Sequence, residues 1–366
     1  MAVCGAGIVG LSLALDLALA GRQVTIFERQ QVMRESSWAA AGMLAASDPE
    51  NPPALRQLAE LSRSLYPQFL QIVSQLSGMS IPIRTHQTIQ AAAYVPHGAF
   101  ELDTASLHAL ASGIDTTSVE AAGLRLFLLE EQSLDPRNLV SALPAATRAA
   151  GALIQENSSV LGISEAAGNL HIATSTGDWT ADALVLASGA WTREIAELPV
   201  APRKGQMAAM SLSGPRQLEV VLRTPEIYLV PRGDGRIIIG ATIEDAGFDK
   251  QVDENAIVRL IDMAASLWPP IREASIVETW AGLRPASPDG LPILGPLESG
   301  ITEAEKSFPI PKSLESRVFA ATGHFRNGIL LAPGTARLLR QMMRGEPLSI
   351  DPTPFRCGRF ALASVH

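Results

Sequence analysis

The chain has 366 residues, of which 47% are hydrophobic and 18% are charged, and its formal net charge is −8. A chain of this length is expected to form two domains, because single domains usually span about 100 to 200 residues. The negative charge excludes the basic surface that nucleic acid or an anionic membrane would need. Its two cysteines, Cys4 and Cys357, exclude a disulfide framework, and its six histidines show no paired spacing of metal ligands. We therefore expect no metal and no nucleic-acid partner.

A glycine fingerprint opens the chain: Gly5, Gly7 and Gly10 follow a very short apolar strand and lead into a helical segment at residues 8–20. In dinucleotide-binding folds these glycines allow a tight turn, the approach of a pyrophosphate, and close packing of helix on strand. A second strand then ends on Glu28, about 20 residues after Gly7, where a carboxylate receives ribose hydroxyls. The alternative is a chance glycine turn in an ordinary α/β unit. Because strand, helix and acid are in register, we predict a dinucleotide site.

The same opening resembles a secretory signal only superficially. Arg22 is the first basic residue, whereas a signal needs a basic region before its apolar stretch, and Asp16 interrupts that stretch. The segment is also shorter than the roughly 20 apolar residues of a membrane-spanning helix. We therefore expect a cytoplasmic protein without a membrane span.

The remaining elements predict an α/β protein whose nucleotide domain is assembled from separated stretches. The Gly-Asp-Gly sequence at 233–235 predicts a hairpin between two apolar strands. Helices are expected at 54–76, 135–151 and 254–267 and in the second half of 323–343; strands near 81–89, 90–94, 153–155, 158–163, 170–174, 183–187, 228–232, 236–242 and 318–321; and a polar loop at 298–316.

Several segments together resemble the flavin-dependent amino acid oxidase family, and within it the glycine oxidases of thiamine biosynthesis. They are GAGIVG, FER, SSWAAAGML, VLASGAW, YLVPR with RIIIGAT, WAGLRPASPDGLPILG and TGHFRNGILLAP, in the family's order and approximate spacing along almost the whole chain. The resemblance implies a discontinuous Rossmann-like FAD-binding domain (1–80, 135–198 and 278–366). It also implies a second α+β substrate domain built on a mixed or antiparallel sheet (81–134 and 199–277). The segment around Arg284 lacks the cysteine to which sarcosine oxidases attach flavin, which indicates noncovalent FAD.

The resemblance also implies which residues hold the cofactor. Glycines would bind the pyrophosphate, Glu28 the ribose, small residues after position 35 the flavin ring, and the backbone of Val160 the adenine. The full set is Gly5, Gly7, Ile8, Val9, Gly10, Glu28, Arg29, Ser36, Ser37, Ala40, Ala41, Gly42, Met43, Val160, Ser188, Gly189, Trp191, Arg284, Gly323, His324, Arg326, Asn327, Gly328, Ile329 and Leu330.

Three residues are implied on the substrate side: Arg284, Tyr228 and Arg326. A guanidinium pairs with a carboxylate through two parallel hydrogen bonds, and a tyrosine hydroxyl can add a third. The alternatives are that Arg284 in Gly-Leu-Arg-Pro is a surface ion-pair partner, that Tyr228 is a core residue, and that Arg326 pairs with Glu or Asp. We expect no base role for His324. Glu226 could repel an anionic substrate or favour its ammonium group.

The implied reaction is oxidative deamination of glycine, sarcosine or a small D-amino acid by hydride transfer to flavin N5. Its products are the oxo acid, ammonia and, with molecular oxygen as acceptor, hydrogen peroxide. Two other kinds of protein stay open: a D-amino acid dehydrogenase or 2-hydroxy acid oxidase of the same fold, and a flavin-binding assembly protein without turnover. Reduction by glycine, sarcosine, D-alanine and glycolate would separate them. The oligomeric state, a homo-oligomer included, is also left open.

Overall fold

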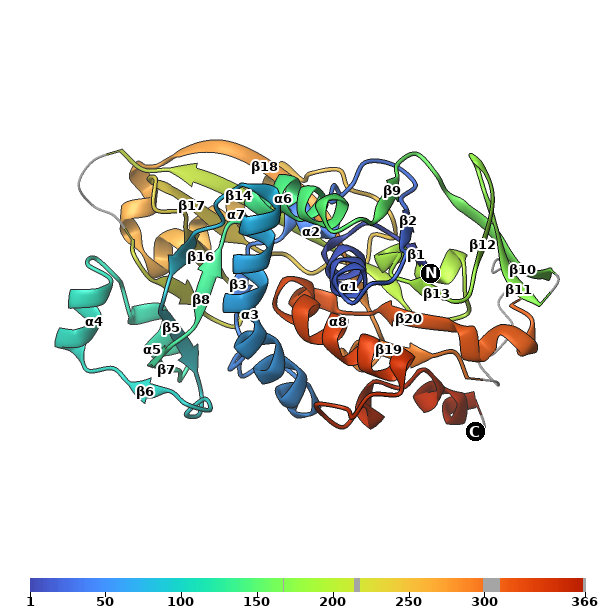
Figure 1. Cartoon of the computed structure of the whole chain (residues 1–366). Helices are drawn as coiled ribbons and strands as arrows, with labels where there is room; N and C mark the ends of the chain where they lie inside the picture. The colour runs from blue at the N-terminus through green and yellow to red at the C-terminus, as the bar shows by residue number, and fades with distance from the viewer. Residues whose placement is uncertain (167, 214–217, 299–309, 365–366) are drawn as a thin grey trace.

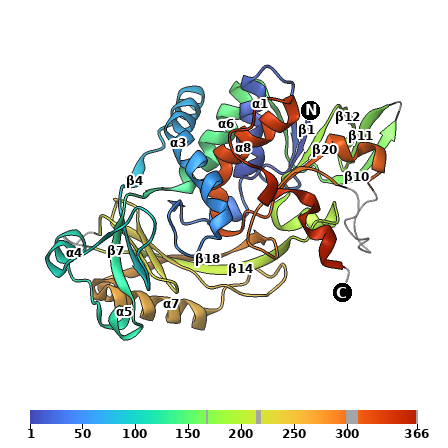
Figure 2. The ribbon, with the colours of Figure 1, turned by 90° about the horizontal axis from the view of Figure 1, so that it is seen from below.

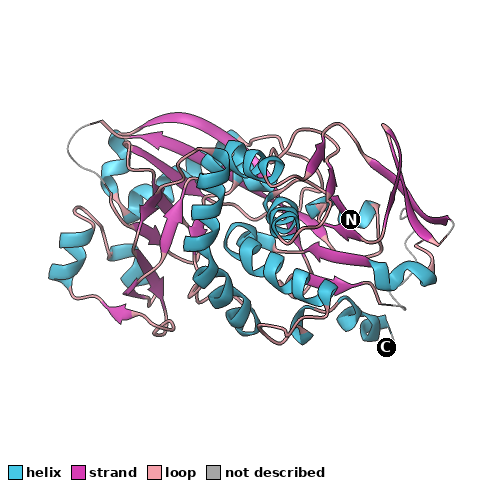
Figure 3. Cartoon of the chain, viewed as in Figure 1, coloured by secondary structure: helices cyan, strands magenta, loops and turns pink. Residues whose placement is uncertain are grey.

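The computed structural model of the chain describes residues 1–166, 168–213, 218–298 and 310–364. Of the expected loop at 298–316, residues 299–309 lie outside the described part, and Lys312–Arg317 forms a short 3-10 helix. The strands gather in two groups, and α1, α3 and α8 run between them (Figures 1 and 3).

The first group is a six-stranded sheet in which five strands are parallel and the edge strand β19 is antiparallel. In spatial order the strands are β19 (Ile293–Pro296), β20 (Val318–Thr322), β13 (Leu184–Leu186), β1 (Ala2–Cys4), β2 (Thr25–Phe27) and β9 (Leu153–Gln155). Strand β1 lies in the middle, and all three of its residues are buried. It is buried because both faces of this sheet are covered, as is usual for parallel strands.

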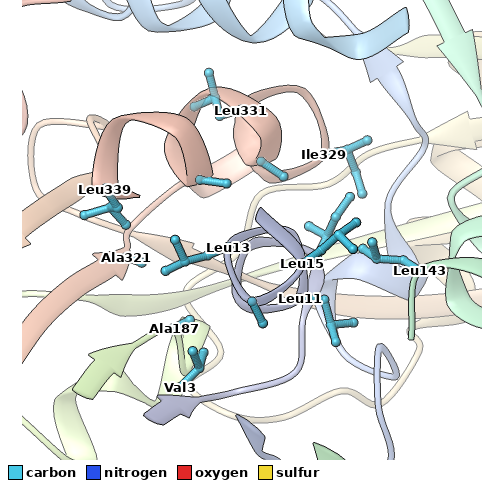
Figure 4. Close-up of a cluster of buried hydrophobic side chains, with 14 of the residues drawn as sticks. Val3, Leu11, Leu13, Leu15, Leu143, Ala187, Ala321, Ile329, Leu331 and Leu339 are labelled. Atoms are coloured by element: carbon cyan, nitrogen blue, oxygen red, sulfur yellow. The ribbon is translucent and has the colours of Figure 1, made fainter. Parts of the chain in front are cut away.

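Helices cover one face of this sheet and a small sheet lies against the other (Figure 2). The helices are α1 (Ile8–Leu19), α3 (Arg56–Ser77), α6 (Pro136–Ala149) and α8 (Gly328–Arg344). Figure 4 shows Leu11, Leu13 and Leu15 of α1 among Leu143 of α6 and Leu339 of α8. The small antiparallel sheet contains β10 (Val160–Ala166), β11 (Asn169–Thr174) and β12 (Gly177–Ala181).

The second group is an eight-stranded mixed sheet in which only the β15–β5 pair, among the described residues, is parallel. In spatial order the strands are β18 (Ser275–Ala286), β14 (Ala201–Ser211), β17 (Arg236–Gly240), β16 (Tyr228–Pro231), β15 (Val221–Arg223), β5 (Thr88–Ala92), β7 (Arg125–Leu129) and β6 (Phe100–Glu101). The outer face packs on α4 (Thr104–Leu110), α5 (Thr117–Ala121) and α7 (Glu254–Leu267). Figure 2 shows these helices on the side away from α1 and α8.

Short elements join the two groups. They are α2 (Ser36–Ala39) and a three-stranded sheet of β3 (Met43–Leu44), β8 (Gln132–Leu134) and β4 (Ile83–Thr85). The indole N–H of Trp280 on β18 donates to the carbonyl of Ala39, 3.0 Å away. This bond fixes the inner face of the eight-stranded sheet against α2.

The structure confirms the expected mixed α/β architecture with a parallel sheet and a second mixed sheet. The helix at 254–267 and the strand at 153–155 occur as expected, whereas β6, β7, β12, α4 and α5 were not expected. The expected domain boundary at residue 278 falls inside β18, so the substrate sheet extends to Ala286. The strand was missed because its second half contains Gly282 and Pro285, which are rare inside strands. Within the described ranges, no helix has the length and apolar character to cross a membrane.

Candidate active site

One cavity of about 580 Å³ extends from the ends of β1 and β2 to the inner face of the eight-stranded sheet. Its walls therefore come from both groups of strands and from α1, α2 and the start of α8. At one end the walls are mostly backbone and small side chains, and at the other they are charged side chains. We call these the nucleotide end and the substrate end.

Glycines shape the nucleotide end. Gly5 has φ +104°, and a Cβ there would lie within 3.0 Å of the Ala187 carbonyl group. A Cβ on Gly10 would lie within 3.0 Å of the Gly5 carbonyl oxygen. Any larger residue would push β13 or α1 away from β1. The fingerprint therefore serves the tight turn and the close packing of helix on strand that the sequence predicts.

The N-terminus of α1 faces this end of the cavity. Gly7, Ile8 and Val9 line it, and the Ile8 amide donates to the Ser37 hydroxyl at 3.0 Å. Within the described residues, the amides of Val9 and Gly10 donate to no partner. Free amides and the positive end of a helix dipole are suited to bind a pyrophosphate.

Glu28 lies in the same wall, only 9% exposed. Its two carboxylate oxygens accept hydrogen bonds from the amides of Ala6, at 2.9 Å, and Gln30, at 3.1 Å. Burial raises the pKa of Glu28, and these two amides act in the opposite direction. The carboxylate is thereby fixed at the end of β2, the position for which the sequence predicts a ribose ligand.

Mostly small residues in α2 and directly after it form another part of the wall. Ser36, Ser37, Ala40, Ala41, Gly42 and Met43 all line the cavity. Gly42 has φ +84°, and a Cβ there would lie within 3.0 Å of the Leu134 carbonyl oxygen. The Ser36 hydroxyl donates to the Leu283 carbonyl, which holds this segment against β18.

A stack of side chains covers another part of the nucleotide end. The Arg29 guanidinium lies 3.6 Å from the centre of a Trp191 ring, and Phe248 stacks on Trp191 with ring centres 5.5 Å apart. Lys250 lies 3.1 Å from the carboxylate of Glu35, which also pairs with Arg29. Val160, Ser188 and Gly189 complete the lining here.

Two glycines make room for Arg284 and Tyr228 at the substrate end. A Cβ on Gly205, in β14, would lie within 3.0 Å of the Arg284 guanidinium. A Cβ on Gly240, in β17, would lie within 3.0 Å of the Tyr228 hydroxyl and ring. Each side chain therefore crosses a neighbouring strand at a residue without a side chain. Neither glycine was among the expected site residues, although Gly240 stands in the strand expected at 236–242.

Arg284 is not a surface ion-pair partner. It lies inside β18, and its Nη1 donates to the carbonyls of Thr242, at 3.0 Å, and Lys204, at 3.5 Å. Among the described residues, no carboxylate oxygen lies within 4.0 Å of its guanidinium. Burial lowers the pKa of Arg284, but an arginine stays protonated at neutral pH. Its positive charge is therefore available to a bound anion.

Tyr228 lies beside Arg284, and its hydroxyl interacts with the guanidinium. The hydroxyl oxygen is 3.0 Å from Sδ of Met207, and a thioether is a weak acceptor. Burial raises the pKa of Tyr228, so the hydroxyl keeps its proton at neutral pH. It can therefore exchange the sulfur for a stronger acceptor.

Arg326, in contrast, is already paired. Its Nη1 donates to Glu50 at 2.6 Å, and its Nη2 lies 3.4 Å from Asp48. Nearby, Arg223 donates to Glu131 at 2.8 Å, and both side chains are buried. The ion-pair alternative for Arg326 is what the structure shows, although Arg326 still lines the cavity.

His324 is a neutral, buried residue of the cavity wall. It is 3% exposed, and its Nε2 lies 3.0 Å from the Thr335 hydroxyl. Burial lowers the pKa of His324 to about 3, so it carries no charge at neutral pH. Among the described residues, the hydrogen-bond partner of its ring is this hydroxyl, which does not line the cavity. That His324 is not a base stays a prediction.

The cavity brings together most of the expected residues. Three do not line it: Gly10 packs against Gly5, the Cβ position of Gly323 faces Ile293 and Ser287, and Leu330 is a core residue of α8. That these three contact the cofactor stays a prediction, and what the structure shows is that Gly10 and Leu330 shape the packing behind the wall. Lining residues that the sequence analysis missed include Asp48, Glu50, Gly205, Met207 and Arg223. Only tertiary contact reveals them, because no local motif surrounds them.

The fold and the shared cavity together define the class: a two-domain, dinucleotide-dependent oxidoreductase. A family model described as FAD dependent oxidoreductase matches residues 1–342, and the chain belongs to that family. Its cofactor is accordingly FAD. Four features of the cavity are suited to FAD. They are the turn at Gly5, Gly7 and Gly10 (the glycine cradle), the N-terminus of α1, the buried Glu28 carboxylate and the cavity volume.

Known relatives cover nearly the whole chain. It is 33% identical to a glycine oxidase of Pseudomonas aeruginosa over 96% of this chain and 97% of that one. It is 33% identical to a bifunctional protein ThiO/ThiG of Synechocystis, over 95% of this chain but 52% of the relative. The crystal structure of glycine oxidase from Geobacillus kaustophilus is similar with a TM-score of 0.85, at 27% identity and 98% coverage of both chains.

Proposed function

We propose that this oxidoreductase oxidises the amine of glycine or of a similarly small amino acid, such as sarcosine or a small D-amino acid. The observation that carries the proposal is the Arg284 guanidinium, which has no described carboxylate oxygen within 4.0 Å, beside the Tyr228 hydroxyl in the cavity that also contains the glycine cradle. Glycine oxidases among the relatives support the same substrate class.

In this proposal Arg284 binds the substrate carboxylate by a charge-assisted pair, and Tyr228 donates a further hydrogen bond to it. Bound FAD supplies the redox chemistry by accepting a hydride from the α-carbon. The cofactor would be held noncovalently by the glycine turn, the α1 amides, Glu28 and the small residues after α2. The chain's own contribution is to fix the carboxylate so that the α-carbon is held in one place.

His324 is a poor proton acceptor, because burial lowers its pKa to about 3 and its Nε2 faces the Thr335 hydroxyl. The substrate amine must therefore reach the site as the neutral base. Loss of a hydride and a proton gives an imino acid, which water hydrolyses to the oxo acid and ammonia. We further propose that molecular oxygen takes the two electrons and two protons, giving hydrogen peroxide. That the imino acid serves thiamine biosynthesis stays a prediction.

Anaerobic titration of the yellow holoenzyme tests the proposal. Glycine, sarcosine or D-alanine should bleach the flavin absorbance, while glycolate should not. Admitting air should restore the colour with one peroxide per bleached flavin. Bleaching by glycolate alone would identify a hydroxy acid oxidase, and recovery only with a quinone would identify a dehydrogenase. Failure of every substrate to bleach would support a flavin-binding protein without turnover.

A further inference from the structure

The segment that follows β17 does not continue the regular pairing with β14. Met207 pairs with Gly240, whereas Lys204 pairs with Glu244, so residues 241–243 face residues 205–206 across the gap. One extra residue on one strand is a β-bulge, a device that turns backbone groups away from the ladder. Here it frees the carbonyl of Thr242, which accepts from Arg284 Nη1 at 3.0 Å.

Hydrogen bonds between buried Gln206 and half-buried Thr242 and Glu244 hold this bulge in place. The Gln206 amide donates to the Thr242 hydroxyl at 2.9 Å, and that hydroxyl in turn donates to the Glu244 carboxylate. The Gln206 side-chain Nε2 donates to the same Glu244 oxygen at 2.8 Å, and its Oε1 accepts from the Asp253 amide at 2.7 Å. Gln206 is fully buried, so each of these groups would be costly to leave unpaired.

We infer that Thr242 and Gln206 are positioning residues for Arg284, which they orient through the bulge without touching the substrate. The inference rests on the proposed role of Arg284 and deepens it. Beyond its interaction with Tyr228, the guanidinium has two backbone carbonyls as hydrogen-bond partners, and the nearer belongs to Thr242. A carbonyl fixes the direction of the guanidinium fork without neutralising its charge. A carboxylate in that place would compete with the substrate.

The test compares matched substitutions at Thr242. Thr242→Val keeps the side-chain shape and the carbonyl but removes the hydroxyl, whereas Thr242→Ser keeps the hydroxyl. Thr279→Val controls for the same change on an exposed residue of β18 away from the cavity. The readout is the dissociation constant of acetate, a carboxylate without an oxidisable amine, measured from the perturbed flavin spectrum. FAD content and Tm are recorded for every variant.

Thr242→Val should weaken acetate binding about 5- to 10-fold, the equivalent of one or two lost hydrogen bonds, with FAD content unchanged. Thr242→Ser should stay within about twofold of the wild type. Gln206→Met, which preserves side-chain volume, should weaken acetate binding at least as much as Thr242→Val. With glycine, the same variants should raise KM more than they lower kcat.

Arg284→Ala distinguishes the proposed anchor role of Arg284 from the positioning role of Thr242. If it abolishes acetate binding while Thr242→Val binds as the wild type does, the positioning role is overturned and the proposed anchor stands. Equal losses in the Val and Ser variants, or loss of FAD in step with loss of acetate, would also overturn it. If Arg284→Ala binds acetate normally, the proposed anchor and the positioning role both fall.

Discussion

The two ends of the cavity are lined by different kinds of group: mainly backbone atoms at the nucleotide end and long side chains at the substrate end. The nucleotide end uses backbone: glycines without side chains, free amides at the start of α1, and one buried carboxylate. The substrate end uses long side chains that cross neighbouring strands through gaps left by Gly205 and Gly240. A backbone site tolerates no added atom, whereas a side-chain site can lose one group and keep the rest. The two ends should therefore respond differently to substitution.

The largest effect is expected at Gly5. Gly5→Ala places a methyl group within 3.0 Å of Ala187 at φ +104°, so backbone strain and a clash add together. FAD affinity should fall more than about 100-fold, measured by titration of the apoprotein. Gly21→Ala is the control, since it has φ +80° but no neighbour within 4 Å. Normal FAD affinity in Gly5→Ala would show that the nucleotide end can adapt.

Arg284→Ala should lower kcat/KM for glycine about 10- to 200-fold with FAD retained, because a hydrogen bond to a charged group contributes about 1.5 to 3 kcal/mol. Arg284→Lys should recover only part of this, since an ammonium cannot form two parallel bonds. Stopped-flow reduction by glycine and by ethylamine, which has no carboxylate, provides the measurement. Equal losses with both amines would mean that Arg284 supports the fold and does not bind the carboxylate.

Gly205→Ala tests whether activity depends on the space that Gly205 leaves for the Arg284 guanidinium as much as on the guanidinium itself. The added methyl must displace the Arg284 guanidinium, so kcat/KM for glycine should fall roughly 10- to 100-fold without loss of charge. Gly162→Ala is the strand control, because the nearest atom to its Cβ is 3.9 Å away. A Gly205→Ala variant with wild-type kinetics would show that the guanidinium has room to move.

Glu28→Gln should have the smallest effect, about a 10-fold loss of FAD affinity, because one acceptor oxygen remains. Burial raises the pKa of Glu28, so its ionised form opposes folding of the apoprotein above that pKa. The Glu28→Gln apoprotein should therefore melt at or above the wild-type Tm near neutral pH. This advantage should vanish as the pH falls through the folded pKa and below the ordinary value of 4.5. A lower Tm near neutral pH would show that the bonds from Ala6 and Gln30 outweigh desolvation.

The glycine turn and first helix of the nucleotide end could be predicted from the sequence alone. A glycine turn, an apolar helix and an acid at the end of the next strand are local in the chain, and each follows from the backbone geometry of one βαβ unit. The parallel sheet, the helix at 254–267 and the small residues that follow α2 were predictable for the same reason. The resemblance to the family indicated Arg284 and Tyr228 as substrate-side residues. It did not indicate which residues surround them.

The charged partners of those side chains could be learned only from the folded structure. Among the described residues, no carboxylate oxygen lies within 4.0 Å of the Arg284 guanidinium, while Arg326 is paired with Glu50 and Asp48, residues some 276 positions away in sequence. Such distant partners leave no periodic or local signal, because strand order and loop paths bring them together. The same holds for the bulge that aims Thr242 at Arg284, since a bulge exists only between two paired strands. A local backbone motif can be predicted from the sequence. The pairing of buried charged side chains cannot, because it depends on which strands become neighbours.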